Sequence, residues 1–425
     1  MTAFVRSWLV MASVLLLSSE SGAQYPPYGG AAAWQGPSRP GFQRDQMATD
    51  PDYELLPDDR GPWQEFDEQF ALTLKDVVAE SWISLEYLNA SFERPGNTLL
   101  GAPIASVPDP RQPFNVTAGA VLDGRAIVPD ASRLELGAQN GVRTTIGINS
   151  FRDFSIEASY VGMQNMVSGF QLVPSNLDPV DFPGSIQFYA TSVLDAGSPG
   201  SRVILYDRLF EVGYSAQYWS GEVNVLLNNR TRNTGFVVRP LLGFRFNSYG
   251  EDLVQHGEFD NNSGVDATLG TLTTPHRNTI RNSTQNTFYM GQIGFQAELV
   301  EKWFTIGVAP KLAVGANKIG SHVMTEDLRD SLIAELANDG VTSANQSSVV
   351  VGTNLDLNGY LKIRVNPWLS LTGSAFYWWM PNVARTPESI VYDDLGIDVA
   401  PAIRPGIETR SMGVKGFTVG AEIKF

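Results

Sequence analysis

From about residue 80 to the end of the chain, apolar and polar residues alternate with a period of two. The segment Phe210–Tyr218 is the clearest case, because its even positions are all apolar while Glu211 and Gln217 occupy odd positions. The last segment, Phe417–Phe425, repeats the pattern. Weaker versions occur at 142–149, 287–299 and 303–317. Successive side chains of a strand point to opposite faces, so each segment predicts a strand with one face for lipid and one for water.

A soluble β-sandwich alternates in the same way, so the composition of the polar face has to decide between the two folds. Here that face carries mainly Gly, Ser, Thr, Asn and Gln with scattered charges, which is typical of a barrel lumen. Several runs also reach the about 9 to 11 residues that a tilted membrane strand needs. The pattern therefore predicts an all-β fold, a transmembrane antiparallel β-barrel.

The spacing of the strands gives the expected topology. Short turns are predicted at 150–153, 220–221, 249–251, 300–302 and 366–367, and most other connections are long, which is the asymmetry of a membrane barrel. These turns give about 12 strands, in a range of about 10 to 14. The expected strands are 80–90, 134–149, 154–165, 207–219, 222–230, 236–248, 252–259, 286–299, 303–316, 348–365, 368–380 and 413–425. The outer connection at 231–235 is short, and the strand at 252–259 is included partly because an even number is required.

The region before the barrel divides into two parts. Residues 1–23 have the features of a signal peptide: Arg6 precedes the apolar stretch Trp8–Leu17, and cleavage is expected after Ala23. An uncleaved anchor is the alternative, but the stretch is shorter than the about 20 residues that span a bilayer. Residues 24–78 are a Pro- and Gly-rich periplasmic extension, in which Phe66–Val78 has the spacing of a short helix. The barrel is expected at 79–425, in the outer membrane.

Aromatic residues support this placement. Six tryptophans lie at or near predicted strand ends, where indole rings favour the membrane interface. They are Trp82, Trp219, Trp303, Trp368, Trp378 and Trp379. The terminal Phe425 closes an alternating strand and is similar to the C-terminal signal that the outer-membrane assembly machinery recognises. That machinery and outer-membrane lipid are therefore expected partners.

Several short blocks resemble a β-barrel porin family described mainly from planctomycete bacteria. They are Trp82–Leu88, Gly243–Phe246, Asn286–Gly294, Phe376–Arg385 and Gly416–Gly420. The resemblance extends over most of residues 80–425 and implies an outer-membrane barrel. It does not supply a transported substrate.

Composition excludes several functions. The absence of cysteine rules out disulfides, thiolate metal sites and cysteine nucleophiles. The formal charge of -15 makes nucleic acid an unfavourable partner. The three histidines, His256, His276 and His322, are far apart and lack the spacing of a metal motif. We expect no cofactor, no metal and no enzymatic activity; the alternative, a hydrolase at the barrel rim using His256, has no evident partner residue.

The candidate functional residues are polar side chains expected to line the lumen. They are Arg143, Glu157, Glu211, Gln217, Glu222, Arg245, Gln292, Glu298, Lys311, Asp356, Lys362, Glu422 and Lys424. Opposite charges in a narrow barrel often pair with one another, so ion pairing is the simpler interpretation and ion selectivity the functional one. The sequence does not determine which sign dominates.

Two functions remain open at this stage. A porin-like channel would let small polar solutes diffuse through the lumen. The alternative is a structural or surface-binding barrel with a filled lumen, since about eight strands leave a filled interior and about sixteen leave an open channel. The sequence leaves the solute and the oligomeric state undetermined.

Overall fold

The computed structural model describes residues 81–118, 122–149, 153–174, 186–194, 201–228, 235–261, 271–328, 340–393 and 403–425. The signal peptide, the extension and its helix, all predicted within 1–78, lie outside these residues. Among the described residues, no helix is long and apolar enough to cross a membrane.

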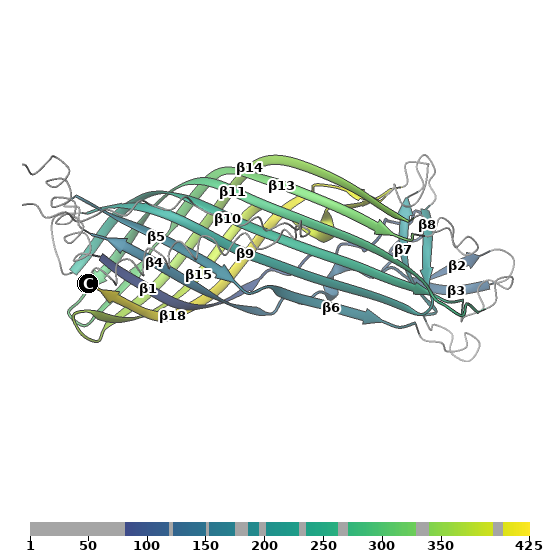
Figure 1. The fold of residues 1–425 in the computed structure, drawn as a ribbon, viewed down its shortest axis with the longest axis horizontal. Helices are drawn as coiled ribbons and strands as arrows, with labels where there is room; N and C mark the ends of the chain where they lie inside the picture. Colours follow the sequence, from purple (N-terminus) through teal and green to yellow (C-terminus); the bar gives the residue numbers. More distant parts are fainter. Residues whose placement is uncertain are drawn as a thin grey trace, which may run out of the picture. The chain divides into compact units, whose positions relative to one another are not determined.

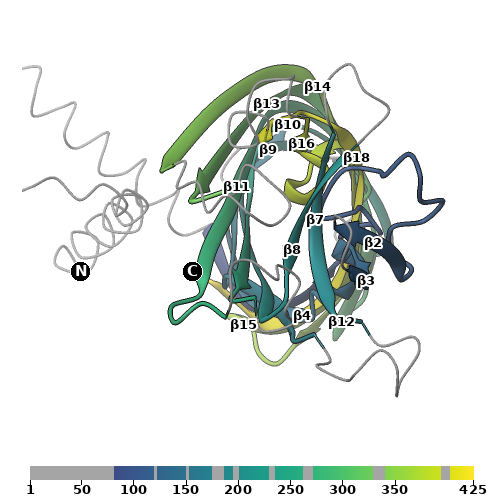
Figure 2. The same ribbon diagram turned by 90° about the vertical axis from the view of Figure 1, so that its right-hand side faces the viewer.

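Antiparallel strands form a closed ring (Figures 1 and 2). They are β1 (Ser81–Phe92), β4 (Ala138–Ile148), β5 (Phe154–Met163), β9 (Leu209–Leu227), β10 (Gly235–Phe259), β11 (His276–Val300), β12 (Phe304–Val308), β13 (Lys311–Glu326), β14 (Val341–Arg364), β15 (Leu369–Ala384) and β18 (Thr409–Lys424). The ring closes because β1 pairs with both β4 and β18, while β9 pairs with both β5 and β10.

Two passes through the ring are interrupted. Pro310 separates β12 from β13, since proline has no N–H to donate to a ladder. The strand β6 (Met166–Leu172) follows β5 and continues alongside β9. Counting each interrupted pass once, the described strands make ten passes, which is the lower end of the expected range.

Two of the predicted turns do not exist. Residues 220–221 lie inside β9, and residues 249–251 lie inside β10, so four predicted strands are two long ones of 19 and 25 residues. Leu227, the last residue of β9, and Gly235, the first residue of β10, therefore lie at the end of the barrel where β5 begins and β11 ends, and not on the outer side. We call this the turn end, and we call the end with the long connections the loop end.

The reason for the error is that β9 changes its environment without changing its direction. Its even positions face inward along the whole strand, from Phe210 at 1% exposure to Leu226 at 0%. Outward positions are apolar near the turn end, as in Val223 and Val225, but polar toward the loop end, as in Glu211. The apolar face of the strand thus points outward inside the membrane and inward beyond it. In the sequence, this reversal looks the same as a turn between two separate strands.

The barrel consequently has two zones. Near the turn end, large apolar side chains face outward and form a belt for lipid, as expected for a membrane barrel. Examples are Leu85, Val142, Leu242, Phe244, Ile293, Ile306, Leu371 and Val419. Toward the loop end, strands β9, β10, β11, β13 and β14 continue beyond this belt with polar outer faces and a buried apolar interior.

A second sheet lies at the loop end, opposite the chain's C-terminus (Figure 1). It consists of β2 (Phe114–Ala118), β3 (Leu122–Ile127), β7 (Phe188–Leu194) and β8 (Ser201–Tyr206), with β3 and β7 parallel. Its core includes Ala126, Phe188, Ala190 and Leu205, each at most 3% exposed. The long connections therefore carry folded structure outside the membrane belt.

Candidate functional site in the barrel lumen

Polar inward side chains near the turn end surround a cavity of about 230 Å³, which we call the chamber. Its charged lining residues are Glu86, Arg143, Glu157, Glu222, Arg239, Glu298, Lys311, Lys362, Arg364, Glu422 and Lys424. Lys424 is 48% exposed, so the chamber meets solvent at the turn end. Acidic and basic groups are present in nearly equal numbers, and the lining carries little net charge.

A network of ion pairs crosses the loop-side part of the chamber. Arg245 Nη2 donates to Glu222 at 2.5 Å and to Asp356 at 2.6 Å. Lys311 Nζ donates to the other oxygen of Glu222 at 2.5 Å. Since β9, β10, β13 and β14 each contribute one of these residues, the network connects four strands across the lumen.

Most of the remaining charges also pair. Glu86 pairs with Arg143, and Arg239 lies 2.7 Å from Glu298, which also accepts from Tyr360. Near the turn end, Lys362 Nζ donates to Glu422 at 2.6 Å. These contacts favour the simpler interpretation of the lumenal charges, in which they satisfy one another.

On the loop-end side of the network, aromatic rings fill the lumen. We call them the aromatic layer. It runs from Phe376 through Trp378, Tyr218 and Phe92 to Tyr249, with consecutive ring centroids 4.4, 5.5, 5.9 and 5.9 Å apart. All five side chains are at most 5% exposed. They come from β15, β9, β1 and β10, so the layer reaches across the barrel and bounds the chamber on its loop side.

A bend in the chain brings a further segment into the lumen. Pro381 cannot donate to the sheet, and Asn382 adopts a left-handed conformation with φ of 59°, which Asn tolerates better than most residues. The register between β15 and β18 shifts at this point. Residues 382–392, here called the plug segment, then pass the inner wall, and they include the short helix η3 (Thr386–Glu388) and β16 (Ile390–Tyr392), which Figure 2 shows inside the ring. The strand β17 (Ile403–Pro405) pairs with β16.

Side chains of the inner wall bind the backbone of the plug segment. Asn286 donates to Ala384 O at 2.8 Å and accepts from Ala384 N at 2.9 Å. Thr386 is held in the same way, since Asn282 donates to its carbonyl at 2.8 Å and its N–H donates to Glu251 at 2.7 Å. The wall thus replaces a partner strand with side-chain groups.

A buried ion pair anchors the plug segment. Arg385 Nε donates to Glu251 Oε1 at 2.8 Å, and Arg385 also donates to Tyr214 Oη at 3.1 Å and to Glu93 O at 2.9 Å. The two charged side chains are only 4% and 0% exposed. Nearby, burial raises the pKa of the Glu388 carboxyl, although Arg410 at 3.0 Å opposes this effect.

The structure places most of the predicted lumenal residues inward, with two exceptions. Arg143, Glu157, Glu222, Arg245, Gln292, Glu298, Lys311, Asp356, Lys362, Glu422 and Lys424 line the chamber or join its network. Glu211 and Gln217 are exposed on the outer wall, because the apolar residues beside them pack inside the barrel and not against lipid. This corrects their predicted orientation.

The predicted interfacial aromatics also divide. Trp303 and Trp368 are exposed at the turn end, and Trp379 faces outward near the other edge of the belt. Trp219 faces outward too and packs against Phe246. Trp82 and Trp378 differ from the expectation, because both face inward: Lys362 lies 5.1 Å from the Trp82 ring, and Trp378 belongs to the aromatic layer. Phe425 is 56% exposed and donates from its N–H to Ser81 O.

Sequence reasoning missed several of these functional residues. Arg239 and Tyr360 carry the inward parity of their strands, so extending the alternation would have identified them. The asparagines that bind the plug segment gave no such signal, because their role depends on a bend elsewhere in the chain.

His256, the candidate for a rim hydrolase, contacts Thr279 at 3.3 Å and lies 3.6 Å from Glu258. Among the described residues, no cluster of three or more His, Asp or Glu is suited to hold a metal ion.

The closed ring, the apolar belt and the polar chamber define an outer-membrane β-barrel. More narrowly, a model of the family described as putative beta barrel porin-7 matches residues 82–425. The chain belongs to this family.

Solved structures of similar fold come from several bacteria. The outer membrane protease OmpT from Escherichia coli matches at 12% identity and a TM-score of 0.39, covering 81% of this chain and 96% of that chain. Ail, the attachment invasion locus protein of Yersinia pestis, matches at 9% identity and a TM-score of 0.23, covering 81% and 97%. A FadL homologue from Pseudomonas aeruginosa matches at 11% identity and a TM-score of 0.21, covering 81% and 90%. No curated protein matches the chain.

Proposed function

We propose that this protein is a closed outer-membrane barrel that does not let solutes diffuse freely and that acts through its outer surface. The aromatic layer carries the proposal, because the rings of Phe92, Tyr218 and Trp378 are at most 5% exposed and fill the lumen between the chamber and the loop end. A ten-pass ring lies near the size at which side chains alone fill the interior. The extension of five strands beyond the belt and the second sheet support a role outside the membrane.

Planar-bilayer recording of the refolded protein tests this proposal. We expect no conductance steps from the unmodified barrel. A variant with Phe92, Tyr218 and Trp378 all changed to Ala should conduct, since it removes the layer, and heat-modifiable gel migration would verify that it still forms a barrel. Discrete steps from the unmodified protein would instead support passive diffusion of small polar solutes.

A second candidate is a gated channel, and the binding of the plug segment favours it. Beyond Ala384, where the pairing of β15 with β18 ends, its backbone is bound to the wall by side chains such as Asn282 and Glu251, so this part can leave without unzipping the wall. Gating predicts that releasing the anchor with Glu251→Gln produces conductance while the aromatic layer is intact. If Glu251→Gln remains silent and the triple alanine variant conducts, the closed barrel is favoured.

A further inference from the structure

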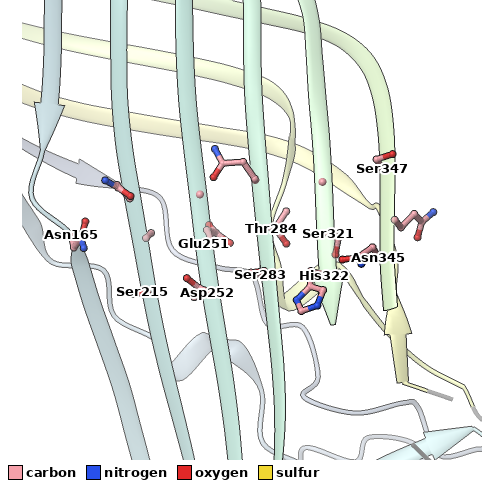
Figure 3. Close-up of a pocket in the computed structure, with 16 residues that line it drawn as sticks. Asn165, Ser215, Glu251, Asp252, Ser283, Thr284, Ser321, His322, Asn345 and Ser347 are labelled. Atoms are coloured by element: carbon pink, nitrogen blue, oxygen red, sulfur yellow. The ribbon is translucent and has the colours of Figure 1, made fainter. Parts of the chain in front are cut away.

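The outer wall carries a groove just beyond the lipid belt. It has a volume of about 510 Å³ and crosses strands β9, β10, β11, β13 and β14 (Figure 3). This groove is separate from the chamber, because the two cavities share no lining residue and the rows described below occupy outward positions of the strands. The proposed function assigns no ligand to this part of the outer surface.

The groove arises from glycines placed in register between amides. Gly250 pairs with Gln217 on one side and Gln285 on the other, and Gln285 pairs in turn with Gly320. Ser347 completes the row on β14. A row of alternating long side chains and bare backbone leaves hollows between the amide groups. A Cβ on Gly320 would meet nothing within 4 Å, which shows that this hollow is open.

The next row toward the loop end forms one wall of the groove and is entirely polar. Register pairing places Ser215, Asp252, Ser283, His322 and Asn345 side by side on neighbouring strands. Figure 3 shows these five residues on successive strands. Hydroxyl, carboxylate, imidazole and amide groups together can donate to and accept from the hydroxyls of a sugar.

The amide of Gln285 is already oriented toward the groove. Its Nε2 donates to Ser248 Oγ at 2.9 Å and to Asn286 O at 3.2 Å. Its Oε1 consequently lies over the backbone of Gly250, only 2.6 Å from where a Cβ would be. The groove therefore presents a fixed acceptor and not a freely rotating side chain.

The height of the groove beyond the apolar belt indicates which part of a lipid molecule can reach it. Phe246 and Tyr289 are paired aromatic residues at the edge of the belt, and on their strands they lie four residues closer to the turn end than Gly250 and Gln285, respectively. Four residues span about 13 Å, or about 10 Å in height at a tilt of about 40°. The polar zone of a phospholipid leaflet adds about 5 to 8 Å outside the hydrocarbon. The groove thus lies at and slightly beyond phosphate level, where sugar-bearing headgroups extend.

Cationic side chains flank the groove on the same outer face. Lys318 lies on β13 two residues closer to the belt than Gly320. Arg281 lies on β11 on the other side, 51% exposed and 3.5 Å from Asp252. A phosphate attached to a sugar in the groove would meet the charge of Lys318, since exposed cations attract anionic lipid headgroups.

We propose that this groove binds the sugar-phosphate headgroup of a glycolipid in the outer leaflet. The lipid chains lie against the belt, the sugar hydroxyls contact the polar row, and the phosphate approaches Lys318. Continuity with the lipid-facing belt distinguishes this ligand from a free saccharide, which would gain nothing from the neighbouring apolar surface.

The test uses the full barrel in phospholipid nanodiscs with lipid A as the added probe, and it measures the shift in the temperature of heat-modified migration as lipid A is titrated. We expect saturable stabilisation. Lys318→Ala should weaken apparent affinity about fivefold, the equivalent of about 1 kcal/mol per cation near a membrane surface. Gly320→Leu should abolish the shift by filling the hollow. Gly291→Leu is the matched control, because it is an outward glycine of the belt whose Cβ also meets nothing within 4 Å.

Two comparisons separate this proposal from simpler ones. Deacylated lipid A and phosphatidylglycerol should each stabilise the barrel less than lipid A does. Equal stabilisation by the deacylated sugar would show a free saccharide site, and equal stabilisation by phosphatidylglycerol would show general anionic lipid binding; either result overturns the proposal. An unchanged shift in Gly320→Leu, with barrel migration intact, also overturns it.

Discussion

Trp219 of β9 and Phe246 of β10 pack against each other on the outer wall, with ring centroids 4.8 Å apart. Both residues mark the level at which the outer face of their strand changes from apolar to polar. Tyr289 of β11 extends the contact, with its ring centroid 5.1 Å from that of Phe246. This aromatic cluster therefore marks the loop-side edge of the membrane belt, where aromatic rings are favoured.

The position of this edge predicts different costs for the same charge on one strand. Val223→Lys places a cation in the belt and should reduce the free energy of unfolding by about 2 to 4 kcal/mol. Glu211→Lys, on the same face beyond the edge, should change it by about 0.5 kcal/mol or less. Denaturant unfolding in phospholipid vesicles measures both. Equal costs would mean that the edge lies elsewhere.

The plug anchor should be sensitive to the loss of one charge. Arg385→Met leaves Glu251 buried without its cation, and breaking a buried pair in this way costs about 3 to 5 kcal/mol. Amide hydrogen exchange in residues 382–392 should accelerate, because the segment loses its anchor. The double variant Arg385→Met with Glu251→Gln should recover part of the protection; if the double variant is as unprotected as the single one, the charge pair is not the anchor.

Asn286 should stabilise the plug segment through both its amide nitrogen and its amide oxygen. Asn286→Asp replaces the amide donor to Ala384 O with an acceptor while keeping the shape of the side chain. We expect faster exchange at Ala384 and Thr386, and a loss of about 1 to 3 kcal/mol, the cost of a buried group left without a partner. Asn140→Asp, at an exposed position on β4, serves as the control and should leave plug exchange unchanged.

The ion pairs of Glu222 predict that losing Glu222 destabilises the barrel more than losing one of its two cationic partners. Glu222→Gln removes the carboxylate that both Arg245 and Lys311 contact, and it should destabilise the barrel by about 3 to 5 kcal/mol. Lys311→Met retains the Arg245 pair and should cost less. Unfolding in detergent or vesicles compares the two, and a larger loss for Lys311→Met would contradict the network as described.

The Glu388 carboxyl gives the plug segment a pH dependence. Its pKa is raised in the folded protein, so the protonated form is the one that burial favours, and ionisation costs stability at pH values above the raised pKa. Lowering the pH through that value should therefore increase the protection of the plug segment against hydrogen exchange, measured relative to the intrinsic rate at each pH. This pH dependence falls between the ordinary carboxyl pKa of 4.5 and the raised pKa of the folded protein. Glu388→Gln should remove it. Identical pH profiles for the two proteins would show that another group controls the plug.

The sequence predicted the barrel and the inward residues well where strands stay inside the membrane. Glu298 and Glu422 face inward opposite Leu299 and Ile423, as simple alternation requires. The prediction was wrong around Phe210–Tyr218, because alternation shows which residues share a face but not what lies on the other side. Beyond the membrane edge, water is outside and the packed core is inside, so the same pattern has the opposite meaning.

The plug segment could not be predicted for a different reason. Its anchors, Glu251 and Asn286, lie about 100 or more residues from the backbone they bind. Nothing in the local pattern near Pro381 indicates that the chain turns into the lumen and not outward. Only the folded wall brings these groups together.

The seam between β1 and β18 has a kinetic consequence. These strands pair residue by residue from Trp82 with Lys424 to Phe92 with Val414, which joins positions more than 300 residues apart in the chain. Contacts of such long sequence separation form slowly, because the entropy of closing the loop must be lost before any pairing stabilises it. Until the last strand arrives, two unpaired sheet edges remain available for association with other chains. The barrel therefore closes late, and the chain is most prone to associate with other chains before β18 pairs with β1.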